Sequence, residues 1–363
     1  MKNWLKKNRV LLLAVVIGLI CAIVYRDSFF SPFFQDDKYH LSLVNQGNPL
    51  QVIKNFPYRP ISLQLFYTLG WFLFGNNVFG FHLLLFLVFV TSLVFVYKLA
   101  LHFLTNPEKS LVCTFIYALN ISIFANFYWV AVSYFVFAAL FLFSSFYFYV
   151  QLKKFSLVSI VLFALALLSN EIAVVFPLIL LGHKIIFNDQ KFRKTLPYLI
   201  MAGLFLVFRY FVVGLPKSPD YELTVSLQSL ATLRWYILRA SNLPEGVNRS
   251  QGLFIWLAWA LQMGILIFSV ARSKIQRLKI VSFAVVWFLA GALPFFFLPN
   301  HMSSYYLTIS LFGTSLLTAN YLENRRLIFV FCLVYLALTV FGLDYLSHTH
   351  WIILKNTGPI GKF

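Results

Sequence analysis

Long apolar runs recur along almost the whole of this 363-residue sequence, separated by short clusters of lysine and arginine. Hydrophobic residues make up 61% of the chain and charged residues only 11%. A soluble domain carries roughly 25% charged residues, so a chain this poor in charge would aggregate in water. The sequence therefore predicts an all-α, polytopic membrane protein, because apolar helices satisfy their own backbone hydrogen bonds in lipid.

A transmembrane helix needs about 20 apolar residues, and about eleven segments approach that length. Two of them share one apolar run, so they form either a tight hairpin or one long kinked helix. A shorter apolar stretch at 60–75 is predicted to be an interfacial helix. The eleven segments lie at about 10–25, 79–101, 110–127, 129–150, 156–170, 172–187, 196–214, 252–271, 280–298, 305–320 and 327–343.

The clusters of lysine and arginine follow every second predicted helix, as the positive-inside rule requires. This pattern predicts a cytoplasmic N-terminus and, with an odd number of helices, an extracytoplasmic C-terminus. Two long loops, at about 26–78 and about 215–250, then face outward, and any chemistry is expected there because long loops often carry function. Residues 1–363 are predicted to form a single polytopic domain in the cell membrane, without a soluble domain.

The positions of the charges and the cysteines argue against three features: a nucleic-acid partner, a disulfide framework and a zinc site. The net charge of +18 is concentrated in clusters between apolar runs, which indicates membrane topology and no nucleic-acid partner. The cysteines Cys21, Cys113 and Cys332 each lie inside an apolar run, and no C-x-x-C pattern occurs. They predict neither a disulfide framework nor a zinc site.

Two of the eleven acidic residues are adjacent, Asp36 and Asp37, in the first predicted outer loop. Adjacent carboxylates repel, which raises the pKa of one of them unless a cation or metal lies nearby. A carboxylate with a raised pKa suits a general base. His40 is a candidate metal ligand or phosphate partner, so a divalent metal held by Asp36, Asp37 and His40 stays open. The alternative is a solvated acidic turn.

Two more charged residues lie close to the predicted membrane surface. Arg59 precedes the interfacial helix, where a guanidinium either binds a phosphate through two hydrogen bonds or extends to lipid headgroups. Glu171 follows Ser169 and Asn170 between two apolar segments. A carboxylate next to a bilayer needs a partner or a water-filled cavity. Glu171 is therefore a candidate site residue, with a polar hairpin tip as the alternative.

The second half of the chain adds polar and aromatic candidates. His301 can bind phosphate when it is protonated or donate a hydrogen bond when it is neutral. Tyr305 and Tyr306 are candidate substrate contacts, although an aromatic belt at the membrane surface would contain the same residues. Arg234 and Arg239 lie in the second outer loop. They predict contact with an anionic headgroup or general attraction to the membrane surface.

Taken together, four of these stretches resemble the GT-C membrane glycosyltransferases, in particular bacterial relatives of the protein O-mannosyltransferases. The resemblance implies a GT-C fold and an inverting hexosyltransferase of the cell envelope, with Asp36 as the base. It implies a polyprenyl-phosphate sugar as donor and an extracytoplasmic glycan, lipid or protein as acceptor. The stretches are Phe34–Asp37, Arg59–Ser62 continuing to Gly80–His82, Leu167–Ala173, and Leu298–His301 followed by Tyr305 and Tyr306.

One departure from the family pattern matters for the donor site. Asn170 stands where the family usually has a lysine, so neutralisation of the donor phosphate has to rely on arginine or histidine elsewhere. Two other functions stay open. A transporter or flippase for lipid-linked glycans would place ionisable groups near mid-membrane and carry a repeat between halves. A glycan polymerase or ligase would use paired outer arginines without a carboxylate base.

Overall fold

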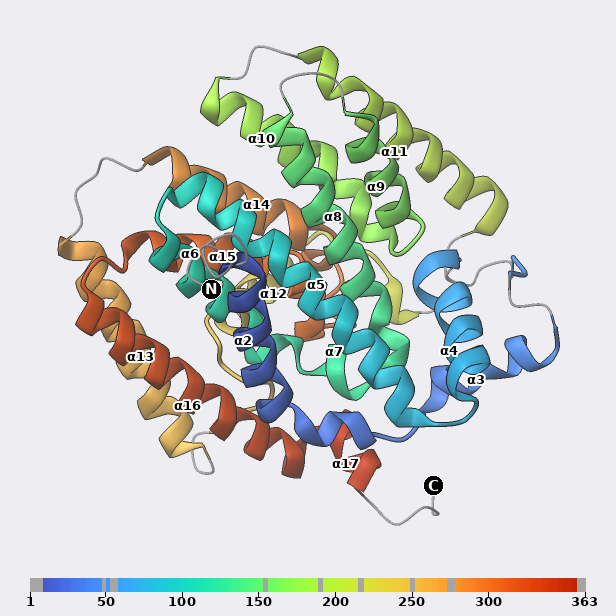
Figure 1. Cartoon of the computed structure of the whole chain (residues 1–363), viewed down its shortest axis with the longest axis horizontal. Helices are drawn as coiled ribbons and strands as arrows, with labels where there is room; N and C mark the ends of the chain where they lie inside the picture. The colour runs from blue at the N-terminus through green and yellow to red at the C-terminus, as the bar shows by residue number, and fades with distance from the viewer. Residues whose placement is uncertain are drawn as a thin grey trace.

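The chain folds into a bundle of helices, and no strand occurs among the residues that the structure describes (Figure 1). The computed structural model describes residues 9–47, 50–52, 58–152, 156–188, 192–214, 219–248, 252–272 and 278–357. The α-helices are α2 (Arg9–Val24), α3 (Gln35–Asn45), α4 (Phe66–Phe74), α5 (Val78–Leu104), α6 (Pro107–Ala118), α7 (Ala125–Tyr128), α8 (Ser133–Gln151), α9 (Leu157–Leu167), α10 (Phe176–Phe187), α11 (Leu196–Phe208), α12 (Gln228–Ala240), α13 (Leu253–Arg272), α14 (Leu278–Phe296), α15 (Leu311–Tyr321), α16 (Arg325–Thr349) and α17 (Trp351–Thr357). Short 3₁₀ or π-helical turns that bear on the site are η2 (Pro60–Leu65), η5 (Glu171–Val175), η7 (Arg209–Val213) and η10 (Ser304–Thr308). The predicted all-α class is confirmed.

Within the described ranges, six helical stretches are long and apolar enough to cross a membrane. A seventh is obtained if Pro107–Ala118 and Ile121–Tyr128, which are bent by 47°, are counted as one span. The multi-pass prediction is confirmed, but the predicted number of eleven is not. Helices α9 and α10 are 11 and 12 residues long, well short of the roughly 20 that a full crossing needs. The six are Val78–Leu104, Val130–Gln151, Leu196–Val213, Leu253–Arg272, Leu278–Phe296 and Arg325–Thr349.

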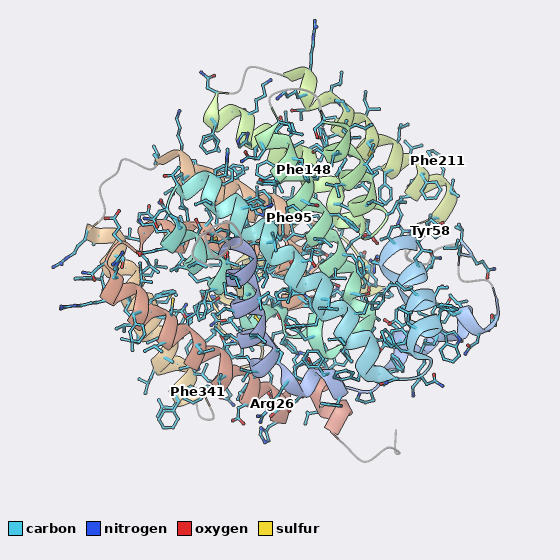
Figure 2. The ribbon with its side chains drawn as sticks, viewed as in Figure 1. Arg26, Tyr58, Phe95, Phe148, Phe211 and Phe341 are labelled. Atoms are coloured by element: carbon cyan, nitrogen blue, oxygen red, sulfur yellow. The ribbon has the colours of Figure 1, made fainter. Side chains whose placement is uncertain are left out.

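Large apolar side chains cover much of the outside of the bundle. Phe211 and Phe341 project outward, with 74% and 47% of their surface exposed (Figure 2). In water, each exposed apolar Å² would cost about 25 cal/mol relative to burial. In a bilayer the same side chains face hydrocarbon, so this exterior is the surface expected of a protein surrounded by lipid.

Close backbone contact joins several of the long helices. Helix α5 packs against α2, α6 and α8, and α14 packs against α10 and α15. Gly313 in α15 lies so close to α14 that an added Cβ would be 2.4 Å from the carbonyl oxygen of Ala284. Membrane helices commonly use such small residues to bring their backbones together, because apolar side chains gain little by leaving lipid.

The α-helical backbone is interrupted between α6 and α7, where a 3₁₀ turn covers Ile121–Ile123, and buried side chains replace the lost α-helical hydrogen bonds. The Asn120 side chain donates to the hydroxyl of Tyr335 in α16, with an Nδ2–O distance of 2.9 Å. The Ile121 N–H donates to Oδ1 of Asn242 at 2.7 Å. Asn120, Asn242 and Tyr335 are all buried. Irregular backbone at membrane depth is tolerated only when protein encloses it, and these contacts enclose it here.

The segment that precedes α5 is packed against that helix through a glycine. The predicted interfacial helix at 60–75 is confirmed as a helix, formed by η2 and α4. Gly70 in α4 faces the ring of Phe81 in α5, and an added Cβ would lie 2.3 Å from Phe81 Cε1. Any larger residue at position 70 would push α4 away from α5. This packing fixes the loop that carries Asp36, Asp37 and Arg59.

Candidate functional site

Asp37 is a structural anchor at the start of α3. Its Oδ2 accepts a hydrogen bond from the Phe34 backbone N–H at 2.7 Å, which caps the helix. Its Oδ1 accepts one from the hydroxyl of Tyr67 in α4 at 2.5 Å. The side chain is 0% exposed, and this burial raises the pKa of Asp37 to about 7, although both hydrogen bonds oppose the shift. Asp37 therefore joins α3 to α4 and has little capacity for another partner.

Asp36 differs from its neighbour because it remains exposed. The surrounding protein still removes enough water to raise the pKa of Asp36, and the positive charge of Arg59 opposes that shift. Asp36 therefore binds a proton more readily than a free aspartate does. An accessible carboxylate with a raised pKa can act as a general base.

A cluster of two arginines and one glutamate lies near Asp36, and we call Arg59, Glu171 and Arg209 the arginine cluster. Arg59 binds Glu171 through two hydrogen bonds, Nε–Oε2 at 2.7 Å and Nη2–Oε1 at 2.9 Å. Nη2 of Arg209 lies 3.8 Å from the same Oε1. Burial opposes ionisation of Glu171, but the charge of Arg59 outweighs burial and lowers the pKa of Glu171. With all three side chains charged, the cluster has a net charge of +1.

The arginine cluster is assembled by loop contacts that join distant parts of the chain. The Ser62 hydroxyl donates to the backbone carbonyl of Ser169 at 2.5 Å, which holds η2 against the turn between α9 and η5. Asn170 caps η5 by accepting the Ile172 N–H at 3.1 Å. This irregular turn divides the apolar run at 156–187 into α9 and α10. Asn170 therefore has a defined structural role at the position where the resembled family usually has lysine.

Two residues of this region were not predicted as site residues from the sequence. The ring of Tyr134 lies under the Arg59 guanidinium, with 3.7 Å between the ring centroid and Cζ, a cation–π contact. Arg209 is buried at the start of η7. A sequence signal for Arg209 existed, because it interrupts an apolar run that continues to Val213. Tyr134 had no such signal among many aromatic residues.

Three of the predicted residues of the second half of the chain, His301, Tyr305 and Tyr306, lie close to one another and to Tyr221. The His301 ring lies 4.5 Å from the Tyr221 ring and 5.8 Å from the Tyr306 ring, between centroids. Tyr305 lies 4.8 Å from Tyr306. Burial raises the pKa of Tyr221, and the charges of Arg59 and Asp36 also act on its hydroxyl. His301, Tyr305 and Tyr306 therefore border the same region as Asp36 and the arginine cluster.

His40 is positioned for packing and not for a metal centre. Its ring lies 5.1 Å from the Tyr67 ring, and burial lowers the pKa of His40 to about 4, so the imidazole is neutral at pH 7. Among the residues that the structure describes, no group of three or more His, Cys, Asp or Glu side chains is arranged to hold a metal ion. Asp36, Asp37 and His40 do not form the metal site considered from the sequence.

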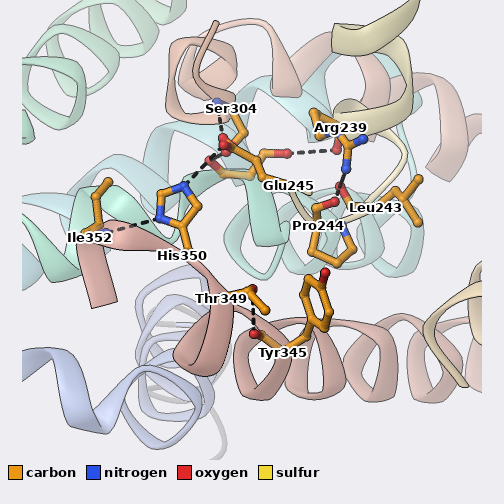
Figure 3. A network of polar contacts seen from close by, with 10 residues as sticks. Arg239, Leu243, Pro244, Glu245, Ser304, Tyr345, Thr349, His350 and Ile352 are labelled. Atoms are coloured by element: carbon orange, nitrogen blue, oxygen red, sulfur yellow. Dashed lines mark hydrogen bonds and ion pairs between the residues drawn. The ribbon is translucent and has the colours of Figure 1, made fainter. Parts of the chain in front are cut away.

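The two remaining predicted arginines, Arg234 and Arg239, lie within α12, apart from these contacts. Arg234 is exposed. Arg239 is buried in a second polar network, where its Nη1 donates to the carbonyls of Leu243, at 3.0 Å, and Pro244 (Figure 3). The predicted contact of Arg234 and Arg239 with an anionic headgroup stays a prediction.

The arrangement of helices is similar to that of a solved membrane protein. The crystal structure of ArnT from Cupriavidus metallidurans, bound to undecaprenyl phosphate, matches with a TM-score of 0.51 at 13% sequence identity. The match covers 86% of this chain but only 60% of ArnT, so the chain spans about three fifths of that protein's length. No protein-family model and no curated protein matches the sequence. The resemblance to the protein O-mannosyltransferases is not confirmed, whereas the predicted multi-pass helical membrane fold is: this chain has a fold like that of ArnT.

Proposed function

We propose that this protein is a membrane glycosyltransferase that transfers a hexose from a polyprenyl-phosphate donor to an extracytoplasmic acceptor. The proposal depends above all on one juxtaposition, the exposed Asp36 carboxylate within electrostatic range of Arg59. Transfer of a sugar from a lipid phosphate needs a base for the acceptor hydroxyl and positive charge for the leaving phosphate. The carboxylate supplies the first and the arginine cluster the second. The ArnT-like fold and the undecaprenyl phosphate bound to ArnT support this donor class.

The proposed reaction is a single displacement with inversion. The acceptor hydroxyl oxygen forms a bond to the anomeric carbon while the bond from that carbon to the phosphate oxygen breaks. The electron pair of the broken bond stays on the lipid phosphate, and Asp36 takes the proton of the hydroxyl. Asp37 holds the start of α3 in place and takes no part in proton transfer.

The arginine cluster is proposed to stabilise the leaving phosphate. Glu171 engages Nε and Nη2 of Arg59, so Nη1 lies outside this two-point contact. Glu171 fixes the guanidinium in one orientation, which favours charge stabilisation because no reorganisation is needed during the reaction. His301 is proposed as a second contact to the donor from the opposite half of the chain.

Turnover of defined donors tests this function directly. Purified protein in lipid nanodiscs is incubated with a panel of polyprenyl-phosphate hexoses and with methyl hexopyranosides as acceptors. We expect release of polyprenyl phosphate together with a glycosylated product. The Arg325→Gln variant should behave like wild type, because Arg325 forms an exposed ion pair with Glu108, and such pairs contribute little. If the wild-type protein shows no turnover and does not bind undecaprenyl phosphate, the proposal is contradicted.

The orientation in the cell membrane is proposed from the clusters of basic residues. A reporter fused after Lys194 is expected to read as cytoplasmic, and one inserted within 215–230 as extracytoplasmic. Alkaline phosphatase and green fluorescent protein fusions distinguish the two sides. If both positions report the same side, the proposed topology is wrong, and with it the outward location of the site.

A further inference from the structure

Three aromatic side chains form a contiguous group beside the acidic pair, and we call Phe34, Trp129 and Trp351 the aromatic platform. The ring centroids lie 5.7 Å apart for Phe34 and Trp129, 5.7 Å for Phe34 and Trp351, and 5.4 Å for Trp129 and Trp351. Trp351 is 43% exposed, and the other two are partly exposed. An exposed indole next to two partly exposed rings offers a surface for a ligand with weakly polar C–H groups.

The aromatic platform is connected to the acidic pair through the backbone. Phe34 precedes Asp36 by two residues and donates its N–H to Asp37. Asp37 also interacts with the backbone of Ala131, two residues after Trp129. Two of the three rings are therefore attached to the backbone that positions the acidic pair, so the platform keeps a fixed position relative to Asp36.

Trp351 is held in place by a buried contact between Glu245 and His350 at the start of α17. His350 Nε2 lies 3.2 Å from Oε2 of Glu245, and Oε1 of Glu245 accepts the Ser304 N–H at 2.6 Å (Figure 3). The Ile352 N–H donates to Nδ1 of His350 at 3.3 Å. These contacts fix the end of α16 to η10 and to the second outer loop. Trp351 thus projects from an anchored element.

The aromatic platform and the arginine cluster are built on different elements of the fold. Trp351 begins α17, whereas Arg209 follows directly on α11. Figure 1 shows α17 and α11 at opposite edges of the view, with α7 between them. A general base must contact the acceptor hydroxyl, while the leaving phosphate belongs with the cations. If the donor phosphate occupies the arginine cluster, the side left for the acceptor is that of the platform.

We propose that the aromatic platform binds the acceptor and that this acceptor is a carbohydrate without a charged group. The inference rests on the proposed function and specifies its acceptor. The polarised C–H groups of a pyranose pack against the electron-rich faces of aromatic rings. Among the residues whose side chains the structure describes, Glu245 and His350 lie next to Trp351 and are paired with each other. An anionic acceptor would need a cation to compensate its loss of water, and this pair does not provide one.

Binding of a methyl hexopyranoside tests the platform without any donor. Saturation-transfer NMR on the full-length protein in nanodiscs should detect contact with wild type and lose at least about tenfold in affinity in Trp351→Ala, with part regained in Trp351→Phe. Undecaprenyl-phosphate affinity should stay unchanged in both variants, which shows that they are folded. Trp256→Ala is the matched control, because Trp256 near the start of α13 packs against Leu243 and Leu338 and contacts the Trp259 ring, and the variant should bind the sugar as wild type does.

Other outcomes overturn the proposal. Equal sugar affinity in wild type and Trp351→Ala would remove Trp351 from the acceptor site, as would equal losses in Trp351→Ala and Trp256→Ala, the result expected of tryptophans that anchor the protein at the membrane surface. Binding of a serine- or threonine-containing peptide in place of the sugar would also contradict it. Because these readouts need no turnover, failure of the platform and failure of the proposed function are distinguishable.

Discussion

Replacing Asp36 with asparagine is expected to slow sugar transfer by about 10²–10⁴-fold, the usual cost of losing a general base. The substitution keeps the size of the side chain and removes its ability to accept a proton. Donor binding should remain, because the lipid phosphate is assigned to the arginine cluster. Initial rates at saturating donor, together with the dissociation constant for undecaprenyl phosphate, separate the two effects.

The neighbouring carboxylate provides the comparison. Asp37→Asn should lower the free energy of unfolding more than the rate of sugar transfer. The two carboxylate oxygens of Asp37 accept hydrogen bonds from Phe34 and Tyr67, and an amide has only one oxygen to offer. A buried donor left without a partner costs about 1–3 kcal/mol. Wild-type turnover in the Asp36→Asn, Asp37→Asn double variant would end the mechanism proposed here.

The pH profile adds an independent check on Asp36. A base must be ionised to accept a proton, so the rate should fall as the pH drops through the pKa of Asp36. Because burial raises that pKa, activity should be lost at a higher pH than for an ordinary aspartate. Arg59 opposes this shift, so removing its charge should move the acidic limb to still higher pH.

Replacing Arg59 with alanine is expected to weaken binding of undecaprenyl phosphate by about 10- to 150-fold, which corresponds to about 1.5–3 kcal/mol for hydrogen bonds to a charged group. The variant should remain folded but less stable, because Glu171 keeps only Arg209, at 3.8 Å, of its two arginines. Breaking this partly buried ion pair from one side leaves the Glu171 charge with less compensation. Calorimetric titration and thermal unfolding of the same samples measure both quantities.

A double variant separates stability from binding. Arg59→Ala with Glu171→Ala should regain stability relative to Arg59→Ala alone, yet it should not regain affinity for the lipid phosphate. His301→Ala should show a smaller loss of affinity, and Arg325→Gln none. If undecaprenyl phosphate binds with unchanged affinity to both Arg59→Ala and His301→Ala, the donor site has been assigned to the wrong residues.

Hydropathy predicted the class of fold but not the number of crossings. It detects apolar runs, whereas a crossing also depends on where the run is broken. The breaks at Asn120 and at the turn before Glu171 arise from polar side chains that bond to distant parts of the chain. Such contacts leave no periodic pattern in the sequence. The sequence therefore predicts longer segments than the 11 and 12 residues of α9 and α10.

The candidate site could be predicted only in part for the same reason. Asp36, Arg59 and Glu171 were identifiable because charge is rare in an apolar sequence. The difference between Asp36 and Asp37 depends on the Tyr67 hydroxyl, 30 residues further along the chain, which reaches one carboxylate and not the other. The pairing of Arg59 with Glu171 spans 112 residues. The first contact depends on the packing of α3 on α4, and the second on the contact of η2 with the turn before η5.

The break between α6 and α7 also restricts the order in which the protein can be assembled during synthesis. Asn120 enters the membrane early, yet its partner Tyr335 is 215 residues further along the chain. Until α16 has been made and inserted, the polar groups of the break lack the partners that enclose them, which is costly in hydrocarbon. The first half of the protein therefore cannot reach its final packing on its own. A ribosome stalled before Tyr335 would leave an incomplete bundle in which the polar groups at the break between α6 and α7 are unpaired, a form that membrane quality control can recognise.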